Sequence, residues 1–175
     1  MAGTPSFDPQ QIIDKYYPEG SPLRDIYMRH ARSVADLALE IAARNGLSLD
    51  PAQIEAAAML HDIGIFLCDA PAIHCHGSQP YISHGPLGAA LLRREGAPEW
   101  AARVAERHTG TGLGEMVPET ELERLICYAD KFYSKSGSMQ RKTLASVEAS
   151  MARFGDENLA RFHSLHQEFS CHVAK

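Results

Sequence analysis

The chain has 175 residues and a formal net charge of −5 at pH 7, with 45% hydrophobic and 22% charged side chains. This is the composition of one globular domain with a core large enough to fold alone. The acidic balance argues against a nucleic-acid polymer as the main partner, and no apolar run approaches the roughly 20 residues of a membrane span. The four cysteines form no Cys-x-x-Cys pair and the N-terminus lacks an export pattern, so we expect a soluble, cytoplasmic protein with reduced thiols.

Capping signals divide the first sixty residues into three predicted helices. Each begins where a side chain that can cap a helix precedes a proline suited to the first turn. These pairs are Asp8-Pro9, Ser21-Pro22 and Asp50-Pro51. Glycines at positions 20 and 46 end the first two helices. The third helix is expected to carry His61-Asp62.

The rest of the chain is predicted to form a long loop and five more helices. Residues 69–83 contain prolines and a glycine but no clear period, which indicates a loop. The helices are expected at 84–95, 97–108, 118–136, 139–153 and 155–172. No segment shows the β-branched alternation of a strand. We therefore predict an all-α fold, a single-domain helical bundle over residues 1–175, with a metal-binding core at about 26–136 and C-terminal helices at about 139–172.

Six residues with metal-binding side chains fall on apolar helix faces. His30, for example, shares a face with Tyr27 and Val34 at steps of three and four residues. An unpaired polar group on such a face costs roughly 1–3 kcal/mol. A single inward histidine is more often a hydrogen-bonded core residue, but five segments that each turn a histidine or aspartate inward indicate one shared metal site. The six residues are His30, His61, Asp62, His84, His108 and Asp130.

The type of these side chains indicates a dinuclear, catalytic centre. Four imidazoles and two carboxylates suit borderline metals such as Fe, Mn, Co, Ni or Zn. Asp62, next to His61, could bridge two ions with its two oxygens. The set contains no thiolate, which disfavours a structural zinc site. Six protein ligands spread over two ions leave positions for water and substrate.

The ordered set of ligands resembles the HD-domain superfamily of metal-dependent phosphohydrolases. Met59-Leu60-His61-Asp62-Ile63-Gly64 is similar to the HDIG variant of its signature. Within that superfamily, three further segments look similar to the HD-type symmetrical dinucleoside tetraphosphate hydrolases of bacteria. They are His84-Gly85-Pro86-Leu87-Gly88-Ala89, Arg107-His108-Thr109-Gly110 and Tyr128-Ala129-Asp130-Lys131.

The resemblance implies an HD-type helical fold, two divalent metal ions and a hydrolytic reaction. One ion would be held by His30, His61, Asp62 and Asp130, and the second by His84, His108 and the bridging Asp62. Iron is the metal expected first. A metal-bound hydroxide would attack phosphorus and cleave a phosphate ester or anhydride. The expected partner is a small phosphorylated molecule, nucleotide-like, with no nucleic-acid polymer and no membrane involved.

The chain departs from the family pattern at Ile65. Many HDIG phosphodiesterases have a lysine there, which would face the substrate phosphate. Lys131, next to Asp130, is the best replacement and is our second candidate catalytic residue after Asp62. Lys135 lies one turn further along. Weaker candidates are Arg93, Arg94 and Arg107, because such side chains mostly lie exposed to solvent.

Two other functions are alternatives to hydrolysis, and one of them stays open. The same ligand set occurs in HD-fold oxygenases that resemble myo-inositol oxygenase and use a mixed-valent diiron pair, and the missing lysine keeps that alternative open. A ligand-sensing or scaffold protein is disfavoured because all six metal positions are present. The loop residues His74-Cys75-His76 either form a wall or lid of the pocket or are merely structural. The sequence leaves the oligomeric state open.

Overall fold

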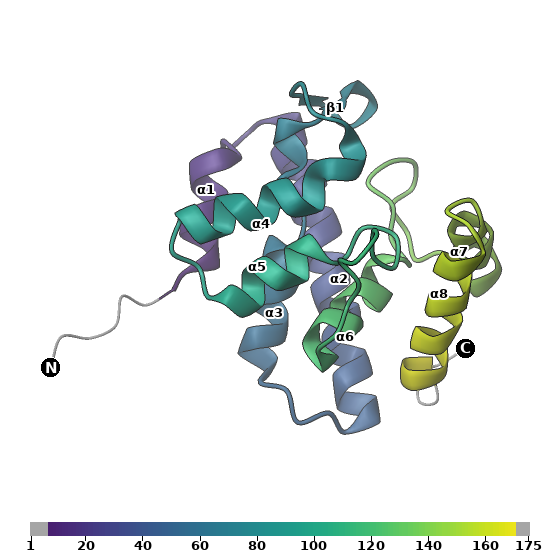
Figure 1. Cartoon of the computed structure of the whole chain (residues 1–175). Coiled ribbons are helices and arrows are strands. Elements are labelled where there is room, and N and C mark those ends of the chain that lie inside the picture. The colour runs from purple at the N-terminus through teal and green to yellow at the C-terminus, as the bar shows by residue number, and fades with distance from the viewer. Residues whose placement is uncertain (1–6, 171–175) are drawn as a thin grey trace, which may run out of the picture.

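The computed structural model describes residues 7–170, and in this part of the chain it shows a bundle of eight α-helices (Figure 1). The first three helices begin where the capping signals predicted. They are α1 (Pro9–Tyr16), α2 (Pro22–Asn45) and α3 (Pro51–Leu60). In each, the residue before the proline accepts a hydrogen bond from a first-turn N–H. α2 ends at Gly46, whose φ of 62° is a left-handed conformation that glycine adopts without strain.

The third helix is shorter than predicted. α3 ends at Leu60, so His61 and Asp62 lie in the turn that follows it and not on the helix itself. The N–H of Ile63 donates to the carbonyl of Leu60 at 3.1 Å, an i to i−3 bond that winds the chain more tightly than an α-helix. The tight turn brings two consecutive polar side chains to the same buried region.

Two tyrosines fix this turn from the side of α1 and α2. The hydroxyl of Tyr27 donates to the carbonyl of Met59, and that of Tyr17 donates to the carbonyl of Ile63 at 2.8 Å. The two rings stack with centroids 4.3 Å apart and are almost completely buried. Their hydroxyls therefore satisfy carbonyl groups that the end of α3 leaves without a helical partner.

The predicted loop over residues 69–83 contains short regular elements. They are two short strands, β1 (Asp69–Ala70) and β2 (Cys75–His76), and two single turns of 3-10 helix, η2 (Pro71–Ile73) and η3 (Tyr81–Ser83). A further 3-10 turn, η1 (Ile65–Leu67), precedes the loop. β1 and β2 pair antiparallel, with Asp69 opposite His76. The expectation that no strand forms is therefore wrong here, because two residue pairs are too few to produce a visible alternation in sequence. The chain as a whole remains all-α, as predicted.

The later helices also have tighter bounds than predicted. They are α4 (His84–Arg94), α5 (Glu99–Glu106), α6 (Glu121–Asp130), α7 (Leu144–Ala152) and α8 (Asp156–Phe169). α6 and α7 begin only where the hydroxyls of Thr120 and Thr143 cap them. α6 ends at Asp130, and residues 131–143, which include three serines and one glycine, are not helical because these residue types form helices poorly. The end of the last predicted helix, 171–172, lies outside the described residues.

The helices pack so that α2 is central. α2 contacts α3 and α6, α4 packs against α5, and α8 lies against α6 and α7 at one side of the bundle (Figure 1). Aromatic rings of Tyr128, Phe162 and Phe169 join α6 to α8. In the part of the chain that the structure describes, no helix is long and apolar enough to cross a membrane.

A buried carboxylate connects α5 to α6. Glu123 is 3% exposed, its carboxylate accepts hydrogen bonds from Arg103 and the Thr120 hydroxyl, and it also accepts the Glu119 N–H. Burial alone would raise its pKa, but these partners lower the pKa below the usual value. The resulting stability is present above the pKa of the unfolded chain and is lost as pH falls through the folded pKa.

We predict that Glu123→Gln destabilises the protein at pH 7 by about 2 kcal/mol, the loss expected for hydrogen bonds to a charged group. The difference from the parent should shrink as the pH is lowered, because the parent then loses the same charge. Urea unfolding at several pH values measures this, with Glu121→Gln in the same helical turn as the control. A difference that stays constant down to low pH would contradict the assignment.

Candidate metal centre

The structure brings the six predicted ligand residues into one buried cluster. In chain order they are His30 in α2, His61 and Asp62 after α3, His84 at the start of α4, His108 after α5 and Asp130 at the end of α6. None of them is more than 9% exposed. Five separate segments therefore contribute to one site.

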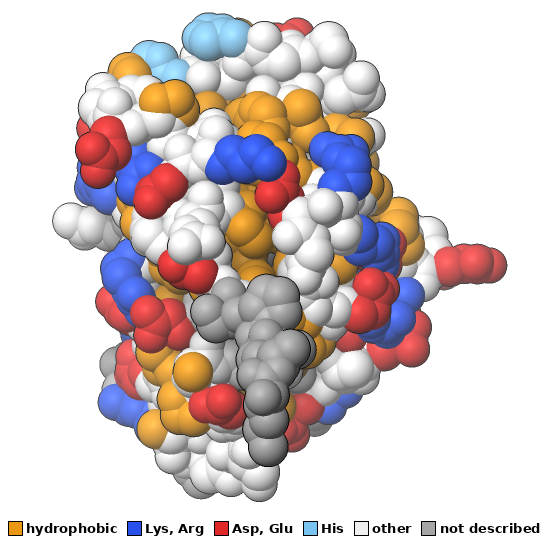
Figure 2. Space-filling view, turned by 90° about the vertical axis from the view of Figure 1, so that its left-hand side faces the viewer, with side chains coloured by type: hydrophobic (Ala, Val, Ile, Leu, Met, Phe, Trp, Pro, Cys, Tyr) orange, Lys and Arg blue, Asp and Glu red, His pale blue; other side chains and the backbone are white. Residues whose placement is uncertain are grey.

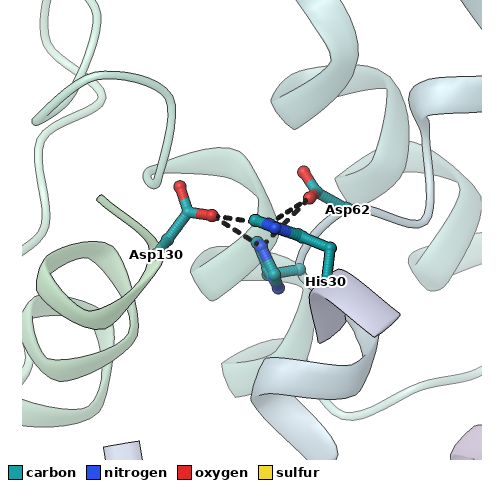
Figure 3. A group of neighbouring side chains, drawn as sticks. His30, Asp62 and Asp130 are labelled. Carbon is teal, nitrogen blue, oxygen red and sulfur yellow. Dashed lines mark hydrogen bonds and ion pairs between the residues drawn. The ribbon is translucent and has the colours of Figure 1, made fainter. Parts of the chain in front are cut away.

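The first group of ligand atoms contains two imidazoles between two carboxylates. The Nε2 atom of His30 lies 2.9 Å from Asp130 Oδ1 and 3.1 Å from Asp62 Oδ2 (Figure 3). The Nε2 atom of His61 lies 3.1 Å from the same two oxygens. These four residues each offer an atom within 4.8 Å of the others, a spacing that a single metal ion could span.

The second group shares Asp62 with the first. The Nε2 atoms of His84 and His108 lie 3.0 Å apart, and they lie 3.3 Å and 3.1 Å from Asp62 Oδ1. Asp62 thus turns Oδ2 toward one group and Oδ1 toward the other. A carboxylate placed in this way can bridge two ions, so the clusters could hold a pair of metals.

Backbone hydrogen bonds set the orientation of three of the histidines. In His61, His84 and His108, the Nδ1 atom lies within hydrogen-bond distance of a carbonyl three residues earlier in the chain. The acceptors are Ala58 at 2.5 Å, Tyr81 at 2.5 Å and Ala105 at 2.8 Å. Because a carbonyl can only accept, Nδ1 carries the proton, and in the neutral ring Nε2 then offers a lone pair to the cluster.

This arrangement fits a metal ion better than it fits a hydrogen-bond network. Two Nε2 lone pairs, on His84 and His108, face each other at 3.0 Å with no proton between them in the neutral rings. Likewise, Oδ2 of Asp62 is buried and accepts no well-aligned hydrogen bond, although the Lys135 ammonium lies 3.0 Å away. A histidine that binds a metal ion usually donates its other ring N–H to a carbonyl or carboxylate, which is the arrangement of these three histidines.

The charges of the cluster also call for a cation. Burial disfavours ionised Asp62 and Asp130, but His61 and Lys131 respectively outweigh it, and the pKa of each carboxyl lies well below its usual range. Burial disfavours protonated His61 as well, yet the two carboxylates raise its pKa to about 10. For His108 burial prevails and lowers the pKa to about 4. The two carboxylates thus favour a proton on His61, and a metal ion could take the place of that proton.

Two lysines reach the cluster from the chain after α6. The ammonium of Lys131 donates to Asp130 Oδ2 at 2.6 Å and to the carbonyl of His108 at 2.7 Å. Lys135 places its ammonium 3.0 Å from Asp62 Oδ2 and 5.5 Å from the centre of the Tyr81 ring. Lys131 is buried in the wall of the site, and Lys135 makes the more direct contact with the shared carboxylate.

Two adjoining cavities open beside the cluster. One, of about 240 Å³, is lined by His84, His108 and Asp130 on one side, and the other has a volume of about 390 Å³. Both are lined by Lys131 and Lys135. A small molecule that entered them would meet the ligands and both ammonium groups together.

A larger cavity, of about 710 Å³, lies elsewhere, between α1, α2 and α3, and none of the six predicted ligand residues lines it. Figure 2 shows the side of the molecule that faces left in Figure 1. Acidic and basic side chains are interspersed on this face, with hydrophobic side chains between them. Buried charged side chains of the cluster line the two smaller cavities and not this one, so we expect a substrate to bind at the smaller cavities.

Gly64 of the signature allows α4 to approach the turn after α3. A Cβ atom at this position would lie 2.5 Å from the carbonyl oxygen of His84 and 2.6 Å from the amide nitrogen of Gly88. We expect Gly64→Ala to push α4 away, lower the free energy of unfolding by about 1–3 kcal/mol, and weaken metal binding through His84. Urea unfolding and metal titration measure the two effects. A variant with the parent's stability and affinity would show that the close approach is not required.

Two of the other candidate cations form ion pairs away from the cluster. Arg93 pairs with Glu99 and Glu106, and Arg107 with Glu119. Neither these two nor Arg94 lines the cavities beside the cluster. In the hairpin, Cys75 is buried whereas His74 and His76 are exposed, and the wall of the larger adjoining cavity is formed by Ala70, Ala72 and Ile73 instead.

Comparison with known proteins identifies a family for the part of the chain that contains all six residues of the cluster. The model of the HD domain matches residues 27–134. Two relatives are named tRNA (cytidine(56)-2'-O)-methyltransferase. The one from Thermoplasma volcanium is 29% identical over 93% of this chain and 47% of its own length, and the one from Picrophilus torridus is 27% identical over 83% and 42%.

A third relative, an uncharacterized protein of Methanocaldococcus jannaschii, is 30% identical over 59% of this chain and 63% of its own length. The chain thus spans less than half the length of the two methyltransferases that it resembles. None of the three is named a dinucleoside tetraphosphate hydrolase. No solved structure matches the chain.

Proposed function

Because the chain belongs to the HD domain family, we propose that it is a metal-dependent phosphohydrolase that cleaves a phosphate ester or anhydride of a nucleotide-like substrate. The observation that carries this proposal is the position of Asp62, which is shared by two buried groups of ligand atoms beside a cavity lined with lysines.

The six ligands would hold two divalent ions, with iron expected first and Mn, Co, Ni or Zn also suited to the donors. His30, His61, Asp62 and Asp130 would hold one ion, and His84, His108 and Asp62 the other. Such a pair lowers the pKa of a water toward about 7 and neutralises charge on phosphate oxygens. Backbone hydrogen bonds fix the rings of His61, His84 and His108, and the burial of the six residues excludes bulk water from all but the cavity side.

The two lysines would bind the substrate phosphate. An ammonium has three donors, and Lys131 uses two of them on Asp130 and the carbonyl of His108. The third remains for an oxygen of a molecule in the cavity that Lys131 lines. Lys135 lines the same cavity and takes the place, in function, of the lysine missing at Ile65.

We predict that Lys131→Ala lowers turnover by about 100-fold even when metal is saturating. Its contact with Asp130 also supports a ligand, so metal affinity should fall by roughly 10- to 100-fold. Steady-state kinetics across a metal titration separate the two effects. If saturating metal restored the parent's turnover, Lys131 would act only by holding Asp130, and its contact with phosphate would be wrong.

The names of the relatives suggest RNA as one source of the nucleotide. The two methyltransferases act, by their names, on a cytidine of tRNA, whereas this chain matches less than half of each. We therefore do not transfer methylation to it. We propose instead that the phosphate to be cleaved belongs to a nucleotide, either free or at the end of an RNA chain.

An anaerobic assay of phosphate release tests the proposed function. The panel holds mononucleotides, dinucleoside polyphosphates, sugar phosphates and short RNAs with a terminal phosphate, each with the metals above. We expect hydrolysis of at least one nucleotide without oxygen, because no redox step is involved. Silence across the panel, together with substrate-dependent oxygen uptake in air, would favour the diiron oxygenase and overturn the proposal.

A further inference from the structure

The mouth of the cavity beside the cluster carries two exposed hydrophobic side chains. Among the described residues, the large hydrophobic side chains that lie exposed are Ile82, at 50%, and Phe154, at 54%. Ile82 belongs to η3 and Phe154 to the turn between α7 and α8. Both line the same cavity of about 240 Å³. Single exposed apolar residues are common, but two that meet at one cavity mark a binding site.

The lining of the cavity combines charged with apolar side chains. Its lining includes three of the metal-ligand residues and two lysines. The remaining side chains are mostly apolar or aromatic, namely Tyr81, Ile82, Met151 and Phe154, with Thr109 beside them. A ligand that fits this arrangement has a phosphate at one end and a flat, weakly polar ring at the other. Sugar phosphates lack such a ring, whereas every nucleotide has one.

We propose that Ile82 and Phe154 form a clamp that holds the nucleobase of the substrate while its phosphate lies at Lys131 and Lys135. This proposal rests on the proposed function of the same site. The clamp recognises the faces of the ring and not the hydrogen-bonding pattern of its edge, since its two side chains carry no polar atoms. It therefore selects bases over ring-free groups but discriminates weakly among bases.

Hydrogen bonds between distant segments fix the part of the chain that carries Phe154. Phe154 extends from the α7–α8 turn, and the same turn lines the second cavity of about 390 Å³. Asn158 of α8 anchors this region to the loop that follows His108, through bonds of 2.7 Å to the Thr111 N–H and 2.9 Å to the Met151 carbonyl. The base-binding side chain and the ligand-bearing loop are thus held by one network.

The variants Phe154→Ala and Ile82→Ala test the clamp, and Phe154→Trp should preserve it. Arg153→Ala, an exposed neighbour that does not line the cavity, serves as the control. One readout is the binding of an ethenoadenosine monophosphate, followed by fluorescence anisotropy. We expect Kd and KM for nucleotides to rise about tenfold in the alanine variants, as for a lost stacking contact. The value of kcat, turnover of a ribose phosphate and metal content should stay near those of the parent.

The outcomes separate the clamp from the proposed function. If the parent hydrolyses nothing in the panel, the proposed function fails. If the parent is active but the alanine variants bind and cleave nucleotides as well as Arg153→Ala does, the function stands and the clamp is wrong. Comparing a free mononucleotide with an RNA that ends in a phosphate identifies the source of the base, and a loss for either in the alanine variants supports the clamp.

Discussion

Asp62→Ala is expected to remove metal from both positions and to lower hydrolysis by more than about 100-fold, since losing only a supporting partner of a ligand costs 10- to 100-fold. The reason is geometric, because the two oxygens of Asp62 face different groups of ligand atoms. Elemental analysis after dialysis against the metal measures the effect. Asp69→Ala, an exposed aspartate a few residues further along, is the control.

Two outcomes would contradict the shared role of Asp62. If the variant retained both ions, the carboxylate would not be a ligand, and if it lost only one, it would not bridge. Removing a buried charge also leaves the neighbouring histidines without a partner, which could prevent folding. Asp62→Asn keeps the shape of the side chain and should show the same loss of metal in a folded protein, as checked by circular dichroism.

Lys135→Ala should lower turnover by about 100-fold, the scale for losing one donor that stabilises a reacting phosphate. Unlike Lys131, it contacts no backbone carbonyl of a ligand residue, and its ion pair is with Asp62 itself. Metal content should therefore be equal to that of the parent or higher, since the ammonium no longer competes for the carboxylate.

The matched control is Lys15→Ala, because Lys15 forms a surface ion pair with Glu95 far from the cluster. Lys135→Arg should recover part of the turnover, as it keeps the charge but changes the donor geometry. Kinetics of Lys135→Ala that equal those of Lys15→Ala would make Lys135 a structural partner of Asp62 and not a phosphate ligand.

The helical bundle and the convergence of the six predicted ligand residues could be predicted because both depend on local patterns. A capping residue before a proline specifies where a helix begins, and the period of apolar residues shows which side faces inward. His30 in α2 and Asp130 in α6 were predicted in this way and lie on buried faces. His61 was predicted to lie on the third helix but lies one residue beyond its end; its backbone keeps a helical conformation, so its side chain still faces inward as predicted.

The features that the sequence did not reveal depend on contacts between distant segments. Lys135 was expected one helical turn beyond Lys131, but the helix ends and the chain turns back before Lys135 reaches Asp62. Likewise, Ile82 and Phe154 are far apart in sequence and show no period in common. Whether an exposed hydrophobic residue belongs to a binding site depends on the cavity that it lines, and that cavity exists only in the folded chain.

Metal titration of the parent protein tests the central claim most directly. The protein is stripped of metal, kept free of oxygen and titrated with Fe²⁺ or Mn²⁺ while bound metal is measured. The two groups of ligand atoms that share Asp62 predict saturation at about two ions per chain. Saturation at one ion, or no binding above that of Asp62→Ala, would contradict the dinuclear centre and the hydrolytic function built on it.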